Sequence, residues 1–323
     1  MTELIEPGAQ LDQDETGIAR LVEGLLSLTE GELSVGALVA LGDRAVPALR
    51  HVLLEGSPST VYLPRQRVVR TLGELGSFWV LSEYLLRDKN ITDPVLRLAE
   101  EAVENTAARE MARSQSDENF YVLRGLAIRR KLPGAVEALA QFRREAAAPV
   151  LVAALESDFC RNAAVEGIRP IYRTAVPYLI ENVRSPEPSR SEESPTSLRR
   201  RQSAVRLLAE QGVDASVWPS LEFLLHESDE WLQSCGAEIA FRMNRHEPAL
   251  RILLSRLTSN DWVLVDEIAQ FLGQHLSAAR QVIVRELQAA SASSSVEDAR
   301  RCRLLRWILK FGAESKTGEN QVG

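Results

Sequence analysis

A short phrase built on proline returns five times along the chain and constrains its fold more than any other feature. In each copy one apolar residue lies two places after the proline and another lies six places after it. The copies are Pro47-Leu49-Leu53, Pro149-Leu151-Leu155, Pro177-Leu179-Val183, Pro219-Leu221-Leu225 and Pro248-Leu250-Leu254. Proline suits the first turn of a helix, because its missing N–H would have no intrahelical partner there. Each phrase therefore predicts a helix that starts near its proline.

The spacing of the apolar residues predicts that each of these helices buries one face. Positions two and six places after the proline fall on the same side of an α-helix. The steps between successive prolines from Pro149 to Pro248 are 28, 42 and 29 residues. A unit that recurs at this spacing indicates a solenoid, in which each unit packs on its neighbours. The predicted fold class is all-α, an α-α superhelix of about eight helix pairs.

The composition agrees with a helical protein from a reducing compartment. Of the 323 residues 45% are hydrophobic and only 6% are aromatic, which favours helices over strands. Cys160, Cys235 and Cys302 are far apart and have no CxxC spacing, so neither disulfides nor a zinc site are expected. The sequence shows neither a signal peptide nor an apolar run that would span a membrane. We therefore expect a cytoplasmic protein without a membrane partner.

The charge balance opposes nucleic-acid binding. The net charge is −7, with 38 basic and 45 acidic residues, which is the wrong sign for a protein that neutralises many phosphates. Two basic clusters stand out: Arg124 to Lys131 with Arg143 and Arg144, and Arg199, Arg200, Arg201 and Arg206. On one face they would hold a phosphate backbone or an acidic peptide. A charge run is more often the solvated face of a helix, so weak nucleic-acid binding through these arginines is kept as an alternative only.

Composition also divides the chain. Residues 1–16 are acidic and predict a disordered leader, and residues 312–323 are polar and predict a disordered tail. The solenoid is expected over residues 17–311. Residues 185–197 contain three prolines and five serines, which predicts an inserted loop. The place of residues 111–131 in the repeat stays open, because a polar stretch interrupts the apolar pattern there.

Turn residues complete the pattern. Just past three of the proline helices lie Ser157-Asp158, Ser228-Asp229 and Ser259-Asn260-Asp261, whose side chains are favoured helix N-caps. Paired helices with such turns, and second helices that open on Val-Pro-x-Leu or Ala-Pro-x-Leu, resemble HEAT repeats of the short bacterial type named after phycobilisome lyases. The likeness is best over residues 135–183 and 200–287. It implies an armadillo-type superhelix that binds another protein along a concave face. A minority of HEAT-like proteins are enzymes, among them bilin lyases, DNA alkylpurine glycosylases and a di-iron hydroxylase.

The chemistry of the candidate residues opposes an enzyme. A di-iron site of the HEAT-like type requires four His-Glu pairs, whereas the sequence has only His226-Glu227 and His246-Glu247, at different places in the unit. We therefore expect no metal and no cofactor. The cysteines are expected to be small buried residues, and no nucleophile with an adjacent base is visible. A chromophore lyase or DNA alkylpurine glycosylase stays an alternative, because a catalytic pocket of Trp, Asp or Glu would gather residues distant in sequence.

The proline helices also predict a partner-binding surface. At about 100° per residue, positions four and seven after the proline point away from the buried face. In HEAT-like arrays the second helix lines the concave side, so these positions are candidates for contact with a partner. They are His51, Leu54, Glu181, Arg184, Phe223, His226, Ile252 and Ser255. Phe223 and Ile252 are the informative members, because apolar residues at exposed positions indicate a contact site. The sequence predicts a non-enzymatic scaffold or adaptor for another protein, whose identity it does not give.

Overall fold

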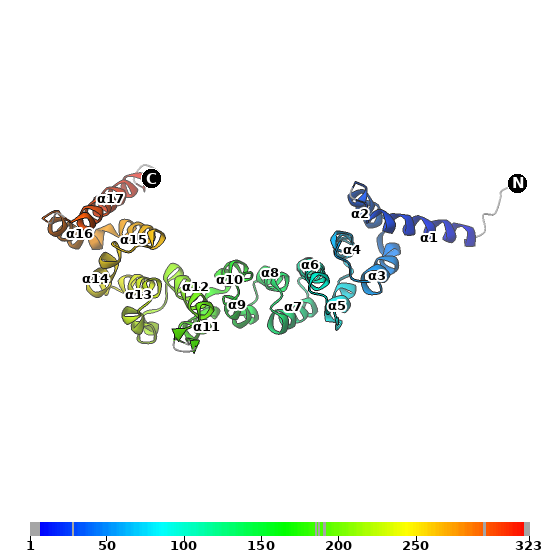
Figure 1. Ribbon diagram of the computed structural model, residues 1–323, viewed down its shortest axis with the longest axis horizontal. Helices are drawn as coiled ribbons and strands as arrows, with labels where there is room; N and C mark the ends of the chain where they lie inside the picture. The colour runs from blue at the N-terminus through cyan, green and yellow to red at the C-terminus, as the bar shows by residue number, and fades with distance from the viewer. Residues whose placement is uncertain are drawn as a thin grey trace. The chain divides into compact units, whose positions relative to one another are not determined.

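The computed structural model describes residues 7–27, 29–184, 186, 188–189, 192–292 and 295–319, and these form an all-α chain (Figure 1). The predicted fold class is confirmed. Residues 1–6 and 320–323, which belong to the predicted leader and tail, lie outside the described residues. The chain divides into two compact units, the first ending at Ile171 and the second beginning at Tyr172.

The first unit consists of two layers of helices. Its α-helices are α1 (Pro7–Gly24), α2 (Gly31–Ala40), α3 (Val46–Leu54), α4 (Leu63–Glu74), α5 (Phe78–Leu86), α6 (Pro94–Met111), α7 (Asp117–Arg130), α8 (Pro133–Phe142), α9 (Ala148–Ala154) and α10 (Arg161–Ile168). Short 3₁₀ helices add η1 (Gly42–Ala45), η2 (Glu145–Ala147) and η3 (Arg169–Ile171). Helices α2, α4, α6, α8 and α10 pack in succession as a first-helix layer, and α3, α5, α7 and α9 as a second-helix layer.

The second unit repeats this arrangement with one irregular pair. Its elements are α11 (Tyr172–Arg184), α12 (Pro195–Gln211), η4 (Ala215–Ser220), η5 (Glu222–His226), α13 (Glu230–Arg242), α14 (His246–Arg256), α15 (Trp262–Gln274), α16 (Leu276–Ser291) and α17 (Val296–Glu319). Within this unit, α12, α13, α15 and α17 pack in succession as a first-helix layer, while α14 and α16 pack together as second helices. In the pair that begins with α12, the 3₁₀ helices η4 and η5 take the place of the second α-helix.

The buried stripe agrees with the prediction. The residues two and six places after each proline are buried, except Leu225, which is half-buried. Pro47, Pro149 and Pro248 lie in the first turn of α3, α9 and α14, as predicted. Pro177 instead lies inside α11, and Pro219 lies within η4, so the predicted helix starts are wrong there. Pro219 suits its place, because the fixed φ of proline is also that of a 3₁₀ helix. Pro177 costs α11 one backbone hydrogen bond, because proline has no N–H donor.

Three predicted boundaries also change. The leader predicted over residues 1–16 is helical from Pro7, and the tail predicted from residue 312 belongs to α17 up to Glu319. The inserted loop ends earlier than predicted, because the Ser194 hydroxyl caps α12 at the Ser197 N–H (3.2 Å) and Pro195 opens the helix. Within this loop β1 (Pro188–Ser189) pairs antiparallel with β2 (Glu192–Glu193).

Helix α7 resolves the register that the sequence left open. The Ser116 hydroxyl accepts from the Asn119 N–H (3.2 Å) and caps the helix after the polar stretch. The buried Asn119 side chain then donates to the Met111 carbonyl at the end of α6 (3.0 Å). Because α7 packs beside α5 and α9, it is the second helix of its pair, although it contains no proline.

Side chains of the first helices bind the ends of the preceding second helices. Arg65 of α4 donates to the Leu53 carbonyl (2.9 Å), Arg161 of α10 to Leu155 (3.1 Å) and Arg201 of α12 to Val183 (2.7 Å). These carbonyls lie at the end of a helix, where no intrahelical N–H is available to them. Arg201 is only 3% exposed and also binds the carboxylates of Glu193 (2.6 Å) and Glu227. Guanidinium groups of the first helices therefore bind the preceding helix pair at the interface between repeats.

We expect Arg201→Met to lower the free energy of unfolding by about 3 kcal/mol, because it leaves two partly buried carboxylates and a helix-end carbonyl without their shared donor. The matched control is Arg206→Met in the same helix, whose ion pairs with Glu210 and Glu267 are exposed. It should cost less than about 1 kcal/mol. Urea unfolding of the full chain followed by circular dichroism measures both, and equal losses would contradict the structural role assigned to Arg201.

Candidate functional site

The predicted partner-binding residues lie on second-helix elements, but they do not all face solvent. His51, Glu181, Arg184, His226 and Ser255 are exposed. Leu54 is only 8% exposed, so the prediction that it points away from the buried face is wrong. Arg87, just past the end of α5, donates to the Leu54 carbonyl, so the next repeat contacts the C-terminal end of α3. His51 and Leu54 belong to the first unit, and the other predicted residues belong to the second.

The two residues singled out in the sequence, Phe223 and Ile252, are half-buried. Phe223 lies in η5, where a 3₁₀ helix turns about 120° per residue, so the angle assumed for an α-helix does not hold. Ile252 lies in α14 and has its expected helical setting. Neither residue presents a fully exposed apolar side chain.

On two helices that lack the proline, exposed apolar residues lie at the position of the proline and seven places after it. Trp79 of α5 replaces the proline of the repeat, and it is 57% exposed, as is Leu86 seven residues later at 54%. In α7 the corresponding pair is Tyr121 (65%) and Ile128 (54%). Residues seven apart share one side of a helix, and α5 packs beside α7. We call Trp79, Leu86, Tyr121 and Ile128 the α5–α7 apolar face. An aromatic residue in the place of the proline, followed by an aliphatic residue seven places later, is the sequence signal that would have identified this face.

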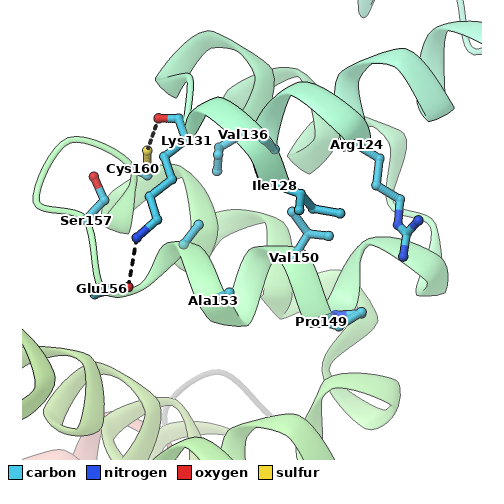
Figure 2. A pocket seen from close by; sticks show the side chains of 12 residues that line it. Arg124, Ile128, Lys131, Val136, Pro149, Val150, Ala153, Glu156, Ser157 and Cys160 are labelled. Carbon is cyan, nitrogen blue, oxygen red and sulfur yellow. Dashed lines mark hydrogen bonds and ion pairs between the residues drawn. The ribbon is translucent and has the colours of Figure 1, made fainter. Parts of the chain in front are cut away.

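A groove of about 280 Å³ opens between α7 and α9, next to this face (Figure 2). Its walls are predominantly apolar. They consist of Arg124, Ala127, Ile128 and Lys131 of α7, Val136 of α8, Pro149, Val150, Ala153 and Ala154 of α9, and Glu156, Ser157 and Cys160 of the following turn. We call this hollow the α7–α9 groove. Its α9 wall is low, because the exposed Ala153 and the half-buried Ala154 carry a single methyl group each.

Polar groups stand at both ends of the α7–α9 groove. Arg124 lies at one end, and at the other Lys131 forms an ion pair with Glu156 (3.2 Å) (Figure 2). Lys131 ends α7 in a left-handed conformation (φ 48°), and its carbonyl lies 3.9 Å from the Cys160 thiol. Cys160 is 1% exposed and Cys235 and Cys302 are also buried, so the cysteines are small buried residues as predicted.

A second groove, of about 630 Å³, lies between α14 and α16 of the second unit. Leu250, Leu254, Ala278 and Val282 supply its apolar part, and Arg251, Arg285 and Arg301 supply cations. His246 lines it and its ring lies 4.5 Å from that of Phe241. The predicted residue Ser255 also lines it. A hollow between adjacent second helices therefore occurs in each unit.

The His-Glu pairs serve other contacts. His226 is exposed, whereas Glu227 binds the buried Arg201. The His246 ring lies against the ring of Phe241 at a tilt of 35°, and Glu247 points to solvent beside Arg251 (3.6 Å). Among the residues that the structure describes, no three His, Cys, Asp or Glu side chains are grouped as a metal site requires.

The basic clusters are largely taken up by contacts within the protein. Arg130 binds Glu104 (3.0 Å), and Arg144 binds Asp117 and donates to the Gln115 carbonyl (2.6 Å). Arg201 is buried, so the prediction of a solvated face is wrong for that residue. The physical reason is the unsatisfied end of α11, which Arg201 binds.

A buried charge network that the sequence did not reveal connects α4, α5, α6 and α7. Glu100 accepts from the Tyr84 hydroxyl (2.6 Å), from Lys89 (3.2 Å) and from Arg65. Lys89 and Arg130 both bind Glu104, which is 1% exposed. Burial alone would raise the pKa of Glu100, but the Tyr84 hydrogen bond and the Lys89 and Arg65 charges outweigh it and lower that pKa. Its acceptors are occupied by neighbouring repeats, which indicates a structural role.

On the first-helix layer of the second unit lies a half-buried carboxyl, Glu238, at which burial outweighs the nearby positive charges. Burial raises the pKa of Glu238 in α13 to about 7. Arg242 and Arg206 oppose this shift, whereas the carboxylates of Glu267 and Glu210 add to it. Arg206 is held by Glu210 (3.0 Å) and Glu267 (2.6 Å), so Glu238 competes for a cation that is already engaged.

We expect Glu238→Gln to stabilise the protein above pH 7 and to have little effect near pH 4. The folded-state pKa of about 7 lies above the ordinary value of 4.5, so the native state holds an extra proton between these values. Wild-type stability therefore falls as pH rises through this window, by on the order of 2–3 kcal/mol, and the glutamine variant is spared this loss. Urea unfolding from pH 4 to pH 8 measures it, with Glu222→Gln on the exposed side of η5 as the control. A stability difference that did not change with pH would refute this assignment.

Two layers of stacked helix pairs define a helical-repeat protein. Residues 134–157, which span α8 and α9, match the model of the PBS lyase HEAT-like repeat, and this supports the HEAT-like repeat family for the chain. The chain matches no curated protein. Among solved structures it is similar to the X-ray structure of YibA from Escherichia coli, with 17% identity and a TM-score of 0.42; the match covers 87% of this chain and 97% of that one. In the described part of the chain no helix has the length and apolar character needed to cross a membrane.

Proposed function

We propose that the protein is a non-enzymatic scaffold or adaptor that binds another protein along its second-helix layer. The observation that carries this proposal is the α5–α7 apolar face beside the α7–α9 groove. Large apolar side chains gathered on adjoining helices are costly to leave in water and are typical of protein contact sites. Trp and Tyr supply much of the binding energy in protein interfaces, and here Trp79 lies on α5 and Tyr121 on α7.

The alternatives find less support in the same surface. A HEAT-like enzyme of the chromophore-lyase or DNA alkylpurine glycosylase type requires convergent Trp and carboxylate groups in one cavity. The α7–α9 groove is lined mainly by apolar groups, and the carboxylate of Glu156 at its end is paired with Lys131. Nucleic-acid binding requires arginines that are available to phosphates. Arg130, Arg144 and Arg201 instead bind carboxylates of this chain.

The proposed location is the cytoplasm. All three cysteines are free and buried, which suits a compartment that keeps thiols reduced. A cytoplasmic adaptor also requires no cofactor, and the proposal includes none.

The test is affinity purification of the tagged full-length protein from its native cytoplasm, with mass spectrometry and an absorbance spectrum of the eluate. We expect a stoichiometric protein partner, and we expect Trp79→Ser with Leu86→Ser to reduce its recovery about tenfold or more, because both side chains are removed from the contact. The matched control is Leu33→Ser with Trp262→Ser, which removes the same two residue types, even more exposed, from the first-helix layer.

The control variant should retain the partner, and circular dichroism should show that both variants are folded. Equal capture by the two variants would place the contact elsewhere. A coloured eluate, or nucleic acid without a protein partner, would contradict the adaptor function.

A further inference from the structure

Arg124 is a cation that the protein leaves without an acidic partner. Within the part of the chain that the structure describes, its guanidinium forms no hydrogen bond or ion pair, and its Nε atom is shielded from water. Arg130 on the same helix binds Glu104, and Arg144 beyond α8 binds Asp117. An N–H group that is shielded from water without an acceptor is destabilising. An acceptor that enters the α7–α9 groove would remove this penalty.

The rest of the α7–α9 groove is suited to apolar groups. Arg124 lies beside Pro149 and near Ile128 and Val150, which face one another across the groove (Figure 2). Ile128 is 54% exposed, and covering it would remove apolar surface from water, which is favourable by about 25 cal/mol per Å². A ligand for this groove therefore combines apolar side chains with an anion.

The hollow has a cause in the repeat pattern. The fourth position after the proline, or after the aromatic residue that replaces it, carries a long side chain in other second helices. It is His51 in α3 and Glu83 in α5. In α7 and α9 the same position holds Gly125 and Ala153, counted from Tyr121 and Pro149. Ala153 lines the groove, whereas Gly125 is not among the residues that line it. The row that a long side chain fills in α3 and α5 is therefore open at α9.

The far end of the groove supplies a second, weaker electrostatic contact. Lys131 lies seven residues after Arg124, about 10 Å along the helix. Its ion pair with Glu156 is largely exposed (68% and 34%), and an exposed pair is worth little and exchanges partners readily. The groove is thus apolar in its middle, with the Arg124 cation at one end and an exposed ion pair at the other.

We propose that the α7–α9 groove binds an acidic apolar segment of the partner protein, whose carboxylate pairs with Arg124 while its apolar side chains lie between α7 and α9. This inference rests on the proposed function, because it gives the groove a protein occupant. A protein segment is favoured over a small apolar acid because Ile128 lines the groove and also belongs to the α5–α7 apolar face, so the apolar surface extends beyond the groove. Amphipathic segments commonly occupy apolar grooves between helices.

The test is selection of phage-displayed linear peptides on the full-length protein, followed by fluorescence anisotropy with the selected peptides. We expect peptides that combine Leu, Ile or Phe with Asp or Glu. Replacing their acidic residues by Asn or Gln should weaken binding about tenfold or more, as should Arg124→Glu in the protein. The control is Arg129→Glu, an exposed arginine of the same helix outside the groove, which should leave affinity unchanged.

A second variant tests the apolar part without touching charge. Ala153→Phe places a large side chain in the groove from an exposed position, so it should abolish peptide binding while the fold is kept. Ala146→Phe, at an exposed alanine of η2 outside the groove, is its matched control. Circular dichroism establishes that both variants are folded.

Several results would overturn the inference. They are selected peptides without acidic residues, equal binding to wild type and Arg124→Glu, no effect of Ala153→Phe, or a selection that yields no peptide dependent on the groove. Competition by octanoate at peptide-like concentrations would assign the groove to a small apolar acid instead. A purified partner that is lost with the Trp79 and Leu86 double variant but retained by Arg124→Glu and Ala153→Phe would leave the proposed function intact and refute the groove inference alone.

Discussion

A guanidinium buried against the carbonyl end of the preceding helix is the contact on which the stacking of the repeats depends. The last carbonyls of a short helix have no internal donor, and those buried between repeats are not open to water. Arginine suits this position because its five N–H groups bind a carbonyl and a carboxylate together. Arg65 and Arg201 both do so, and each thereby fixes one repeat against the next.

This use of arginine also determines what the surface offers to a partner. The arginines that bind between repeats are not available to a partner, so only an arginine left out of this stacking can offer its charge to a ligand. Arg124 is such a residue, since the structure describes no acceptor for it, whereas Arg130 and Arg144 nearby are neutralised. The electrostatic character of the α7–α9 groove therefore follows from which arginines the stacking leaves unused.

Much of the fold could be predicted, because the buried stripe is a local property of the sequence. Leu49, Leu151 and Leu250 are buried as their spacing from proline required. The candidate surface was predicted less well, because the rule was tied to proline, whereas the physical requirement is only the helical period. Helices α5 and α7 satisfy that period without proline, so Leu86 and Ile128, seven places after Trp79 and Tyr121, were not identified. Contacts such as Arg201 with Glu227 depend on how repeats stack, and the local pattern does not contain that information.

The α7–α9 groove shows how a repetitive array acquires a distinct binding place. Stacking alone does not require a small residue at Ala153, because this position is exposed and α3 and α5 carry His51 and Glu83 there. A larger side chain would shield Ile128 from water at no cost to the buried core. An open apolar row is therefore unfavourable for the isolated chain, and it becomes favourable when another surface fills it. The binding place lies where α9 departs from the long side chains of this row, and Arg124 at the end of the groove then selects for an acidic occupant.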